Sequence, residues 1–307
     1  MATDEQKRRD KLEENRTWWL NRIAEDEENA KKIADDYSER LRQMYESQYK
    51  KTVVKLNALM SRVQEGKGLS RTQLWNYAQW IDLERSLSQF VKGGSMIECE
   101  RVTACLDSVF EQTIGVQRDT LNRKTFSVAV DPRTVIDSAW SGERYSTRIW
   151  KNRTALAQRI RTDMEDMLVQ GRGLREMRMM LQEEFGVGYR QADTLLRTEM
   201  SYVFNQAHRA RYKSAGVKKL QWVAKNEEIK RCAVCRSGNN TVYPAGTTRV
   251  LPAHPRCGCR WVPVIELQGE DIPADGEEVF AERMRAEEEA EAKAREERKR
   301  KRRKSGD

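Results

Sequence analysis

The sequence contains no hydrophobic run that approaches the ~18 consecutive apolar residues of a membrane-spanning helix, so it predicts no membrane association. Its first residues, MATDEQKRRDKLEENR, lack the apolar core of a signal peptide. We therefore expect the chain to fold in the cytosol, where thiols stay reduced. In that compartment, the six cysteines of the chain favour metal binding over disulfide formation.

Proline is scarce, with none before Pro132 and none between Pro132 and Pro244. This permits long helices, because an interior proline costs a helix about 3 kcal/mol. Ser70 is placed to cap a helix at its N-terminus and Gly216 to cap one at its C-terminus. Breaks are expected at Gly93-Gly94 and at residues 185–188. The spacing of apolar residues predicts helices over 5–64, 70–91, 95–121, 134–140, 144–170, 174–185 and 189–214.

The pattern changes after Gly216. Residues 220–223 favour a strand, residues 238–240 (Gly-Asn-Asn) a turn and residues 241–243 a return strand, while residues 126–130 indicate a short strand or an extended linker. The expected fold is mainly α with a small β-rich C-terminal module, an α+β class. We expect four consecutive segments: a helical docking region (1–130), a helical core (131–216), a Cys/His β-hairpin module (217–265) and a charged tail (266–307) that is disordered or a single helix.

The strongest local motif is Cys232-x2-Cys235 followed, after eighteen intervening residues, by His254-x2-Cys257-x-Cys259. Two pairs of ligands brought together by a hairpin can enclose one tetrahedral ion, and Zn²⁺ accepts mixed sulfur and nitrogen ligands. The motif contains five candidate ligands for four coordination positions. Cys232, Cys235 and Cys257 are favoured for three of them, and either His254 or Cys259 supplies the fourth. The sequence therefore predicts a structural zinc site, with a cluster of reduced thiols or a late disulfide as the alternative.

Positive charge is concentrated at the C-terminus. The net charge of +9 would be +2 without one run of seven consecutive basic residues. That run consists of Arg298, Lys299, Arg300, Lys301, Arg302, Arg303 and Lys304. Such a segment binds polyanions through counterion release and without sequence preference. We expect it to contact double-stranded DNA non-specifically, with protein docking or a solubilising role as the alternatives.

Two other features have more than one interpretation. Trp18 and Trp19 are adjacent on a predicted helix, so they cannot share one narrow face, and one of them either packs inside the protein or docks onto a partner. Cys99 and Cys105 lie six residues apart on a predicted helix and are interpreted as ordinary buried thiols.

Four stretches in the second half resemble the phage head morphogenesis (minor capsid, Mu F-like) family. Together they cover roughly residues 130–265, and their order and spacing are more specific than any one of them. They are Tyr145-Ser-Thr-Arg-Ile-Trp150 with Asn152, Leu196-Arg197-Thr198-Glu199 with Asn205, Arg231-Cys-Ala-Val-Cys235 with Val242-Tyr243, and Pro252-Ala-His-Pro-Arg-Cys-Gly-Cys-Arg260 with Val262-Pro263. One departure concerns an Asp that the family commonly has before its first cysteine. Here Glu227 or Glu228 stands in for that acid, or its role is absent.

The resemblance implies a low-copy minor head protein of a tailed bacteriophage that acts in capsid assembly. Family members associate with the portal vertex, are packaged inside the prohead and in some cases bind DNA. The implied partners are the portal protein, the major capsid or scaffolding protein and packaged phage DNA. The implied location is the virion, inside the head near the portal, after assembly in the host cytoplasm.

Arg197, Thr198 and Glu199 are consecutive on a predicted helix and point in three directions. We expect Arg197 and Glu199 to fasten that helix to the β-rich module through ion pairs or backbone hydrogen bonds, and Asn205 to hold a loop backbone. A structural protein is thus favoured over an enzyme. The alternatives are a DNA-binding zinc-module protein outside the virion, and a phage-fused nuclease or transferase that uses Arg197, Glu199, Asn205 and His208.

Overall fold

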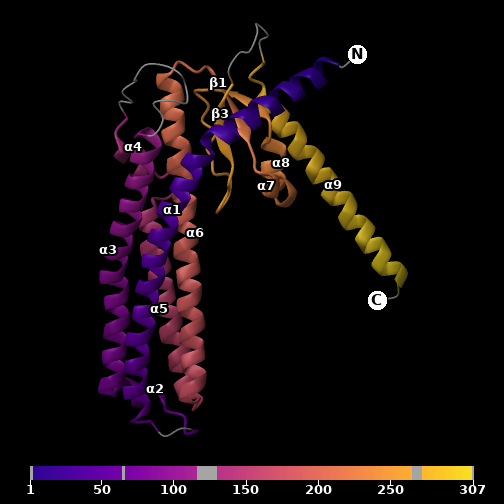
Figure 1. Cartoon of the computed structure of the whole chain (residues 1–307). Coiled ribbons are helices and arrows are strands. Elements are labelled where there is room, and N and C mark those ends of the chain that lie inside the picture. Colours follow the sequence, from indigo (N-terminus) through magenta and orange to yellow (C-terminus); the bar gives the residue numbers. More distant parts are fainter. Residues whose placement is uncertain (1–2, 64–65, 116–129, 265–271, 306–307) are drawn as a thin grey trace. The chain divides into compact units, whose positions relative to one another are not determined.

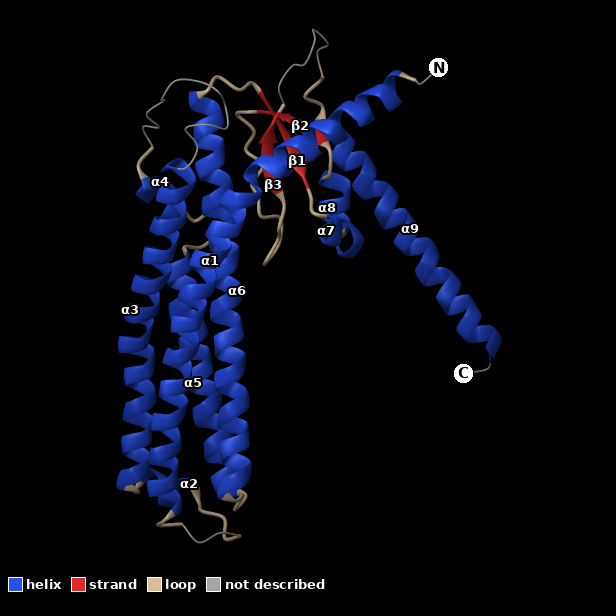
Figure 2. Cartoon of the chain, viewed as in Figure 1, coloured by secondary structure: helices blue, strands red, loops and turns tan. Residues whose placement is uncertain are grey.

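The computed structural model describes residues 3–63, 66–115, 130–264 and 272–305. These residues form long helices and a small three-stranded antiparallel sheet (Figure 1, Figure 2), which confirms a mainly α chain with a small β-rich C-terminal module. The chain divides into two compact units. We call residues 30–109 and 131–200 the bundle unit, and residues 1–29, 110–130 and 201–307 the lobe unit. Both units are discontinuous in sequence, whereas the four expected segments are consecutive.

The bundle unit is built from helices that lie side by side (Figure 1). The helix that starts at residue 71 begins with a capping box, in which Ser70 Oγ accepts from the backbone N–H of Gln73 while the Gln73 side chain accepts from the Ser70 N–H; this confirms the predicted cap. The helices of this unit are α1 (Asp4–Met60) from residue 30 onward, α2 (Arg71–Trp75), α3 (Ala78–Gly115) up to residue 109, α4 (Pro132–Ile136), α5 (Tyr145–Val169) and α6 (Leu174–Ser214) up to residue 200.

The two breaks expected at glycines are wrong. Helix α3 continues through Gly93 and Gly94, and α6 continues through Gly186 and Gly188. At two of these positions a neighbouring side chain occupies the space of a Cβ atom. A Cβ on Gly94 would lie 2.2 Å from Arg153 Nη1, and one on Gly188 would lie 2.5 Å from Leu156 Cδ2. These glycines therefore permit close packing between helices rather than ending them.

A buried ion pair crosses the bundle core. The Arg153 guanidinium of α5 donates through Nε to Glu98 Oε2 of α3 at 2.6 Å, and both side chains are almost fully buried. Arg153 also lies over the rings of Tyr45 and Phe90, and donates through Nη1 to the Phe90 carbonyl. Burial raises the pKa of Glu98, while Arg153 and the Tyr45 hydroxyl oppose that rise. The charged pair is tolerated inside the bundle because each partner is hydrogen-bonded.

The lobe unit is organised around a sheet of three antiparallel strands in the order β2-β1-β3. Strand β1 (Lys219–Val223) pairs with β2 (Thr241–Pro244) on one side and with β3 (Arg260–Pro263) on the other. This confirms the predicted strand, turn and return strand. The predicted C-cap is confirmed too: Gly216 has a φ of +76° directly after α6, and the Val217 N–H returns to the Tyr212 carbonyl.

Both faces of this sheet are covered. On one face, Val223 and Val262 pack against Trp19 and Ile23 of α1. Trp19 is therefore an internal packing residue, whereas its neighbour Trp18 is 45% exposed. The other face carries an aromatic cluster of Trp222, Tyr243 and Trp261, which also contains the buried cysteines Cys235, Cys257 and Cys259. Side chains that alternate along the strands therefore pack into two separate hydrophobic clusters, one on each face of the sheet.

Two short helices and one long helix complete the lobe unit. Helices α7 (Asn226–Arg231) and α8 (Ala233–Gly238) occupy the connection between β1 and β2, where only a turn was predicted. The expected tail includes one helix, α9 (Gly276–Ser305), whose Phe280 stacks on Trp222 with ring centroids 5.7 Å apart. The linker predicted over 126–130 lies outside the described residues except for Val130. None of the described helices combines the length and apolarity needed to cross a bilayer.

Candidate metal centre

The five predicted ligands come from two chain segments that meet beside the sheet. Cys232 lies at the start of α8 in an extended conformation, and Cys235 lies within that helix. His254, Cys257 and Cys259 lie in the segment that leads into β3. The hairpin of β1 with β2 and the pairing of β1 with β3 bring these segments together. The five side chains form a cluster that is compatible with a metal site.

Cys235 is the centre of the cluster. It belongs to two groups of three potential ligands, one with Cys232 and His254 and one with Cys257 and Cys259, and within each group the donor atoms lie within 4.8 Å of one another. Its Sγ lies 3.1 Å from His254 Nε2 and 3.7 Å from Cys257 Sγ. Two sulfurs bound to one tetrahedral zinc ion lie about 3.8 Å apart, whereas a disulfide requires about 2.05 Å. All six cysteines are free.

The electrostatics of the cluster favour a bound cation. Hydrogen bonding towards Cys257 and Cys259 raises the pKa of Cys235, and the same contact with Cys235 lowers the pKa of Cys257 to about 2. Burial adds to the cost of ionising Cys235. The cluster therefore accepts one negative charge easily and resists further ionisation. A divalent cation would remove that resistance, because thiolates are the form in which cysteines bind metals.

The orientation of His254 fits a ligand. Its Nδ1 lies 2.9 Å from the Pro255 carbonyl oxygen, which can only accept a hydrogen bond, so Nδ1 is the donor. The other ring nitrogen, Nε2, then faces Cys235. Metal-binding histidines are commonly fixed by such a bond from the other ring nitrogen to a carbonyl.

Glu228 lies beside the cluster. Its Oε1 accepts from the Gly258 N–H at 3.2 Å, and its Oε2 lies 3.3 Å from His254 Nε2. Of the two glutamates that could replace the family's acid, Glu228 is thus the one in contact with the cysteine segment. The sequence offered the pair and no way to choose between them.

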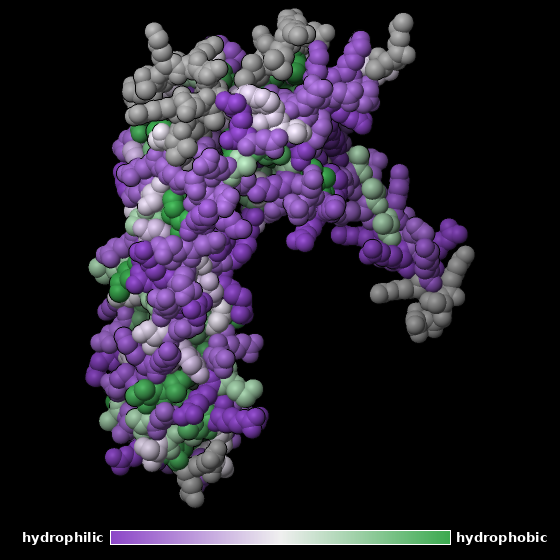
Figure 3. Space-filling view, viewed as in Figure 1, coloured by the Kyte–Doolittle hydropathy of each residue, from purple (hydrophilic) through white to green (hydrophobic). Residues whose placement is uncertain are grey.

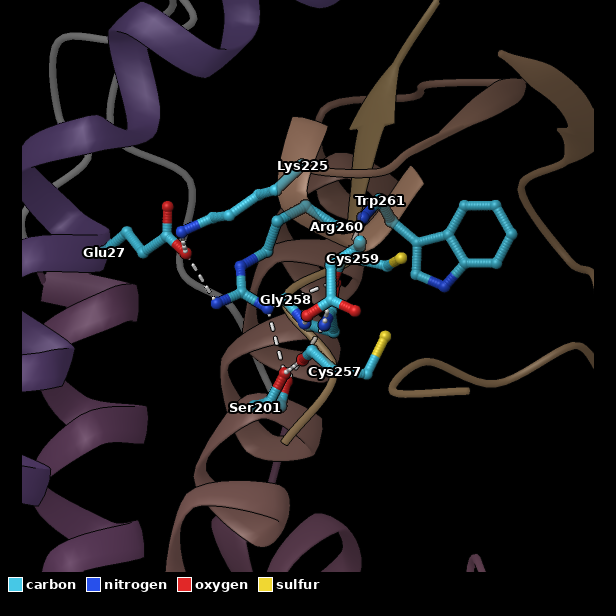
Figure 4. Close-up of polar contacts among 10 residues, drawn as sticks. Glu27, Ser201, Lys225, Cys257, Gly258, Cys259, Arg260 and Trp261 are labelled. Atoms are coloured by element: carbon cyan, nitrogen blue, oxygen red, sulfur yellow. Dashed lines mark hydrogen bonds and ion pairs between the residues drawn. The ribbon is translucent and has the colours of Figure 1, made fainter. Parts of the chain in front are cut away.

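The ligand segment is fastened to α6 by two side chains (Figure 4). Ser201 Oγ donates to the Cys257 carbonyl at 2.9 Å. Asn205 Nδ2 donates to the Cys259 carbonyl at 3.1 Å, and Asn205 Oδ1 accepts from the Trp261 N–H at 3.0 Å. The prediction that Asn205 holds a loop backbone is confirmed. Ser201 was missed, although it precedes Asn205 by four residues and so shares its helix face.

A second anchor connects β3 to α1 (Figure 4). Arg260 donates through Nη1 to Ser201 Oγ and through Nη2 to Glu27 Oε1 at 2.8 Å, and Lys225 Nζ lies 2.6 Å from the same oxygen. Burial alone would raise the pKa of Glu27, but Arg260 and Lys225 together lower it. Glu27 is therefore held as a carboxylate between two cations, Arg260 on β3 and Lys225 just after β1.

The role expected for Arg197 and Glu199 is wrong. Arg197 forms ion pairs with Asp35 and Asp193, and Glu199 accepts from Arg148 at 2.6 Å and from the Trp140 indole at 2.8 Å. All of these partners belong to the bundle unit, and none lies in residues 217–265. The reason is the position along α6: residues up to Met200 face bundle helices, and the residues that hold the lobe begin at Ser201.

The remaining predicted residues have separate environments. Thr198 donates to the Thr194 carbonyl within its own helix. His208 is buried between Phe204 and Tyr212, and burial, Arg211 and Arg260 lower its pKa to about 3. Burial raises the pKa of Cys105 to about 12, as expected for a packed thiol. Arg298 to Lys301 are exposed on α9, and the side chains of residues 302–304 lie outside the description.

No protein-family model, curated protein or solved structure matches this chain.

Proposed function

We propose that the Cys/His cluster is a structural zinc centre in a phage minor head protein. The observation that carries the zinc proposal is the convergence of five soft donors around Cys235. Zn²⁺ suits this donor set because it binds thiolate and imidazole ligands tetrahedrally and needs no redox partner. Bound zinc would stabilise the lobe by joining α8 to the segment before β3.

We assign the four ligands to Cys232, Cys235, His254 and Cys257. His254 is preferred over Cys259 because Pro255 orients its Nε2 towards Cys235. Cys259, which shares one group of donors with Cys235 and Cys257, is the alternative fourth ligand.

Metal analysis of the purified full chain tests this assignment. We expect one zinc per chain in the wild type and in Cys259→Ala, and loss of zinc in Cys232→Ser and His254→Ala. Zinc loss in Cys259→Ala with retention in His254→Ala would support four cysteine ligands instead. A metal-free wild type, purified without chelators, would overturn the zinc proposal and leave the head-protein proposal untouched.

The head-protein proposal rests on the four resembling stretches. Two of them supply the cysteines and the histidine that lie together in the lobe, and Asn205 of a third is hydrogen-bonded to the same segment. Motifs that are distant in sequence thus contribute to one structure, as a shared family fold requires. The proposed role is low-copy assembly at the portal vertex, inside the head.

Mass spectrometry of purified phage particles tests that role. We expect the protein in the particles at a few copies relative to the major capsid protein. Its absence from particles that contain a full set of head proteins would contradict the proposal.

We also propose that the basic end of α9 contacts packaged DNA. The run from Arg298 to Lys304 would neutralise up to seven phosphates, which predicts a log–log salt dependence of binding with a slope of up to about −6. Deleting residues 298–307 from the full chain should abolish binding to a short DNA duplex, measured by fluorescence anisotropy. Binding that survives the deletion, or that does not weaken with salt, would contradict this contact.

A further inference from the structure

A groove of about 740 Å³ runs between α1 and α3 within the bundle unit. Phe90, Gly93 and Gly94 line it along α3, and Met44 lines it along α1. A Cβ atom on Gly93 would meet nothing within 4 Å, so the helix backbone is open to a neighbour there. The Arg153 guanidinium closes the space behind Gly94. A partner helix can therefore approach α3 more closely here than over ordinary side chains.

The lining of this groove is positively charged. It includes five cationic side chains and, within the described residues, no carboxylate. The cations are Arg40, Lys51, Lys55, Arg101 and Arg153. Several of them are neutralised from outside the groove, such as Lys55 by Asp82 and Arg153 by Glu98.

Lys51 and Arg101 remain available. Neither forms an ion pair with a described residue, and Arg101 only donates to the backbone carbonyl of Arg40. They lie on the two helices that border the groove. Val54 and Ile97, which are 66% and 44% exposed, add apolar surface beside them. The groove thus offers glycines along its floor, some apolar surface and two cations that form no ion pair with any described residue.

The matching surface occurs in this same chain. Residues 286–297 of α9 read AEEEAEAKAREE, with six acidic and two basic side chains separated by alanines. This stretch is exposed apart from the half-buried Glu287, and Figure 3 shows mainly hydrophilic surface with paler apolar patches along α9. Its Glu287 pairs with Arg236, but Glu288 and Glu289 form no ion pair with a described residue. Alanine allows close helix approach, and the glutamates supply the charge that the groove lacks.

We propose that the groove of one copy binds residues 286–297 of α9 from a second copy. Twelve helical residues span about 18 Å, so the stretch can follow the groove for several turns. The two surfaces are different, so the contact is heterologous and leaves one free groove and one free helix at the ends of any open assembly. Copies joined in this way form open chains or closed rings, and the smallest ring is a pair in which the helix of each copy binds the groove of the other.

Charge-reversal variants test the groove and the α9 helix separately. The groove variant is Lys51→Glu with Arg101→Glu, and the helix variant is Glu288→Lys with Glu289→Lys. A matched control, Arg62→Glu with Arg175→Glu, reverses two exposed cations that do not line the groove. Sedimentation velocity of each full chain is measured from about 1 to 100 µM, at about 0.05 M and about 0.5 M salt.

We expect the wild type and the control to associate as concentration rises, and the higher salt to weaken the association constant at least about tenfold. Each charge-reversed variant alone should remain a monomer. A mixture of the groove variant with the helix variant should regain association, because the unaltered groove meets the unaltered helix in one contact and the two reversed surfaces are complementary in the other. A monomeric wild type across the range, or a mixture that stays monomeric, would overturn the proposal. So would association of either variant at the wild-type level.

Discussion

The side chain of Asn205 is hydrogen-bonded to the backbone on both sides of Arg260, accepting from the Trp261 N–H and donating to the Cys259 carbonyl. One helical side chain therefore fixes the point where the ligand segment becomes strand β3. We expect Asn205→Ala to destabilise the lobe unit by about 2 to 4 kcal/mol, because two buried backbone groups lose their partner. Thermal unfolding followed by tryptophan fluorescence measures this, since Trp222 and Trp261 lie in the lobe.

Asn205→Asp is the matched control for this prediction. Its carboxylate can still accept from the Trp261 N–H but cannot donate to the Cys259 carbonyl. A loss of stability at least as large as that of Asn205→Ala is expected, because the buried carboxylate would face the Cys259 carbonyl oxygen with no proton between them. Equal stability of the wild type and Asn205→Ala would show that these hydrogen bonds do not hold the lobe.

Substitution of alanine for two glycines of α6 is expected to change the stability of the protein in opposite directions. A Cβ at position 188 would lie 2.5 Å from Leu156 Cδ2 and 2.9 Å from Tyr45 Cε1, so Gly188→Ala should cost about 1 to 3 kcal/mol through overpacking. At position 186 the nearest atom is the flexible end of Arg190 at 3.4 Å, so Gly186→Ala should be neutral or stabilising by up to about 1 kcal/mol. Urea denaturation followed by far-UV circular dichroism compares the two. The same sign for both variants would contradict the packing of α6 against α1 and α5.

The ion pair of Arg153 and Glu98 predicts strong coupling between two substitutions. Glu98→Gln leaves a buried guanidinium without a counter-charge and should destabilise the bundle unit by about 3 to 5 kcal/mol. The double variant Glu98→Gln with Arg153→Met removes both charges and should cost less than either Glu98→Gln or Arg153→Met alone. A double-mutant cycle from urea denaturation measures the coupling energy. Additive costs would contradict a buried pair.

His208 predicts a loss of stability at acidic pH. Its pKa is about 3 in the folded protein and about 6.5 when unfolded, so between these values the unfolded chain binds a proton that the folded chain excludes. The stability contributed by neutral His208 is complete above about pH 6.5 and falls by about 1.4 kcal/mol per pH unit below it.

Comparison with His208→Phe isolates this effect. The substitution keeps an aromatic ring between Phe204 and Tyr212 and removes the titrating group. The free energy of unfolding should therefore decline less between pH 7 and 5 in the variant than in the wild type, because every other titrating group is common to both proteins. Parallel pH profiles would show that His208 does not titrate as its burial requires.

Local signals in the sequence predicted many of the elements and the set of cysteine and histidine residues that cluster beside the sheet. Apolar residues predicted the paired strands β1 and β2 but not the two helices between them, and the cysteine spacing predicted a cluster that the structure brings together. Ser70 and Gly216 were found because capping depends on residue type at one position. Each of these features depends on only a few neighbouring residues, so the sequence alone is enough to predict it.

Tertiary effects were not predictable in the same way. Gly94 and Gly188 resemble helix breaks until the neighbouring helix is in place, because the need for a small residue comes from Arg153 and Leu156. The sequence predicts the contacts to the β-rich module at Arg197 and Glu199, one helical turn before the residues that make them. The apolar pattern of α6 does not change at the residue where its neighbours change, so the pattern cannot locate that residue. Glu27, some 230 residues from Arg260, could be assigned only from coordinates.

The packing of Trp19 and Ile23 against Val223 and Val262 has a consequence for biosynthesis. The residues that cover the sheet emerge from the ribosome first, and the strand that they complete emerges more than two hundred residues later. At about 5 to 20 residues per second, that interval is on the order of 10 to 50 s. During translation Trp19 and Ile23 have no sheet to cover. We therefore expect nascent chains stalled before β3 to be bound by chaperones through this apolar stripe.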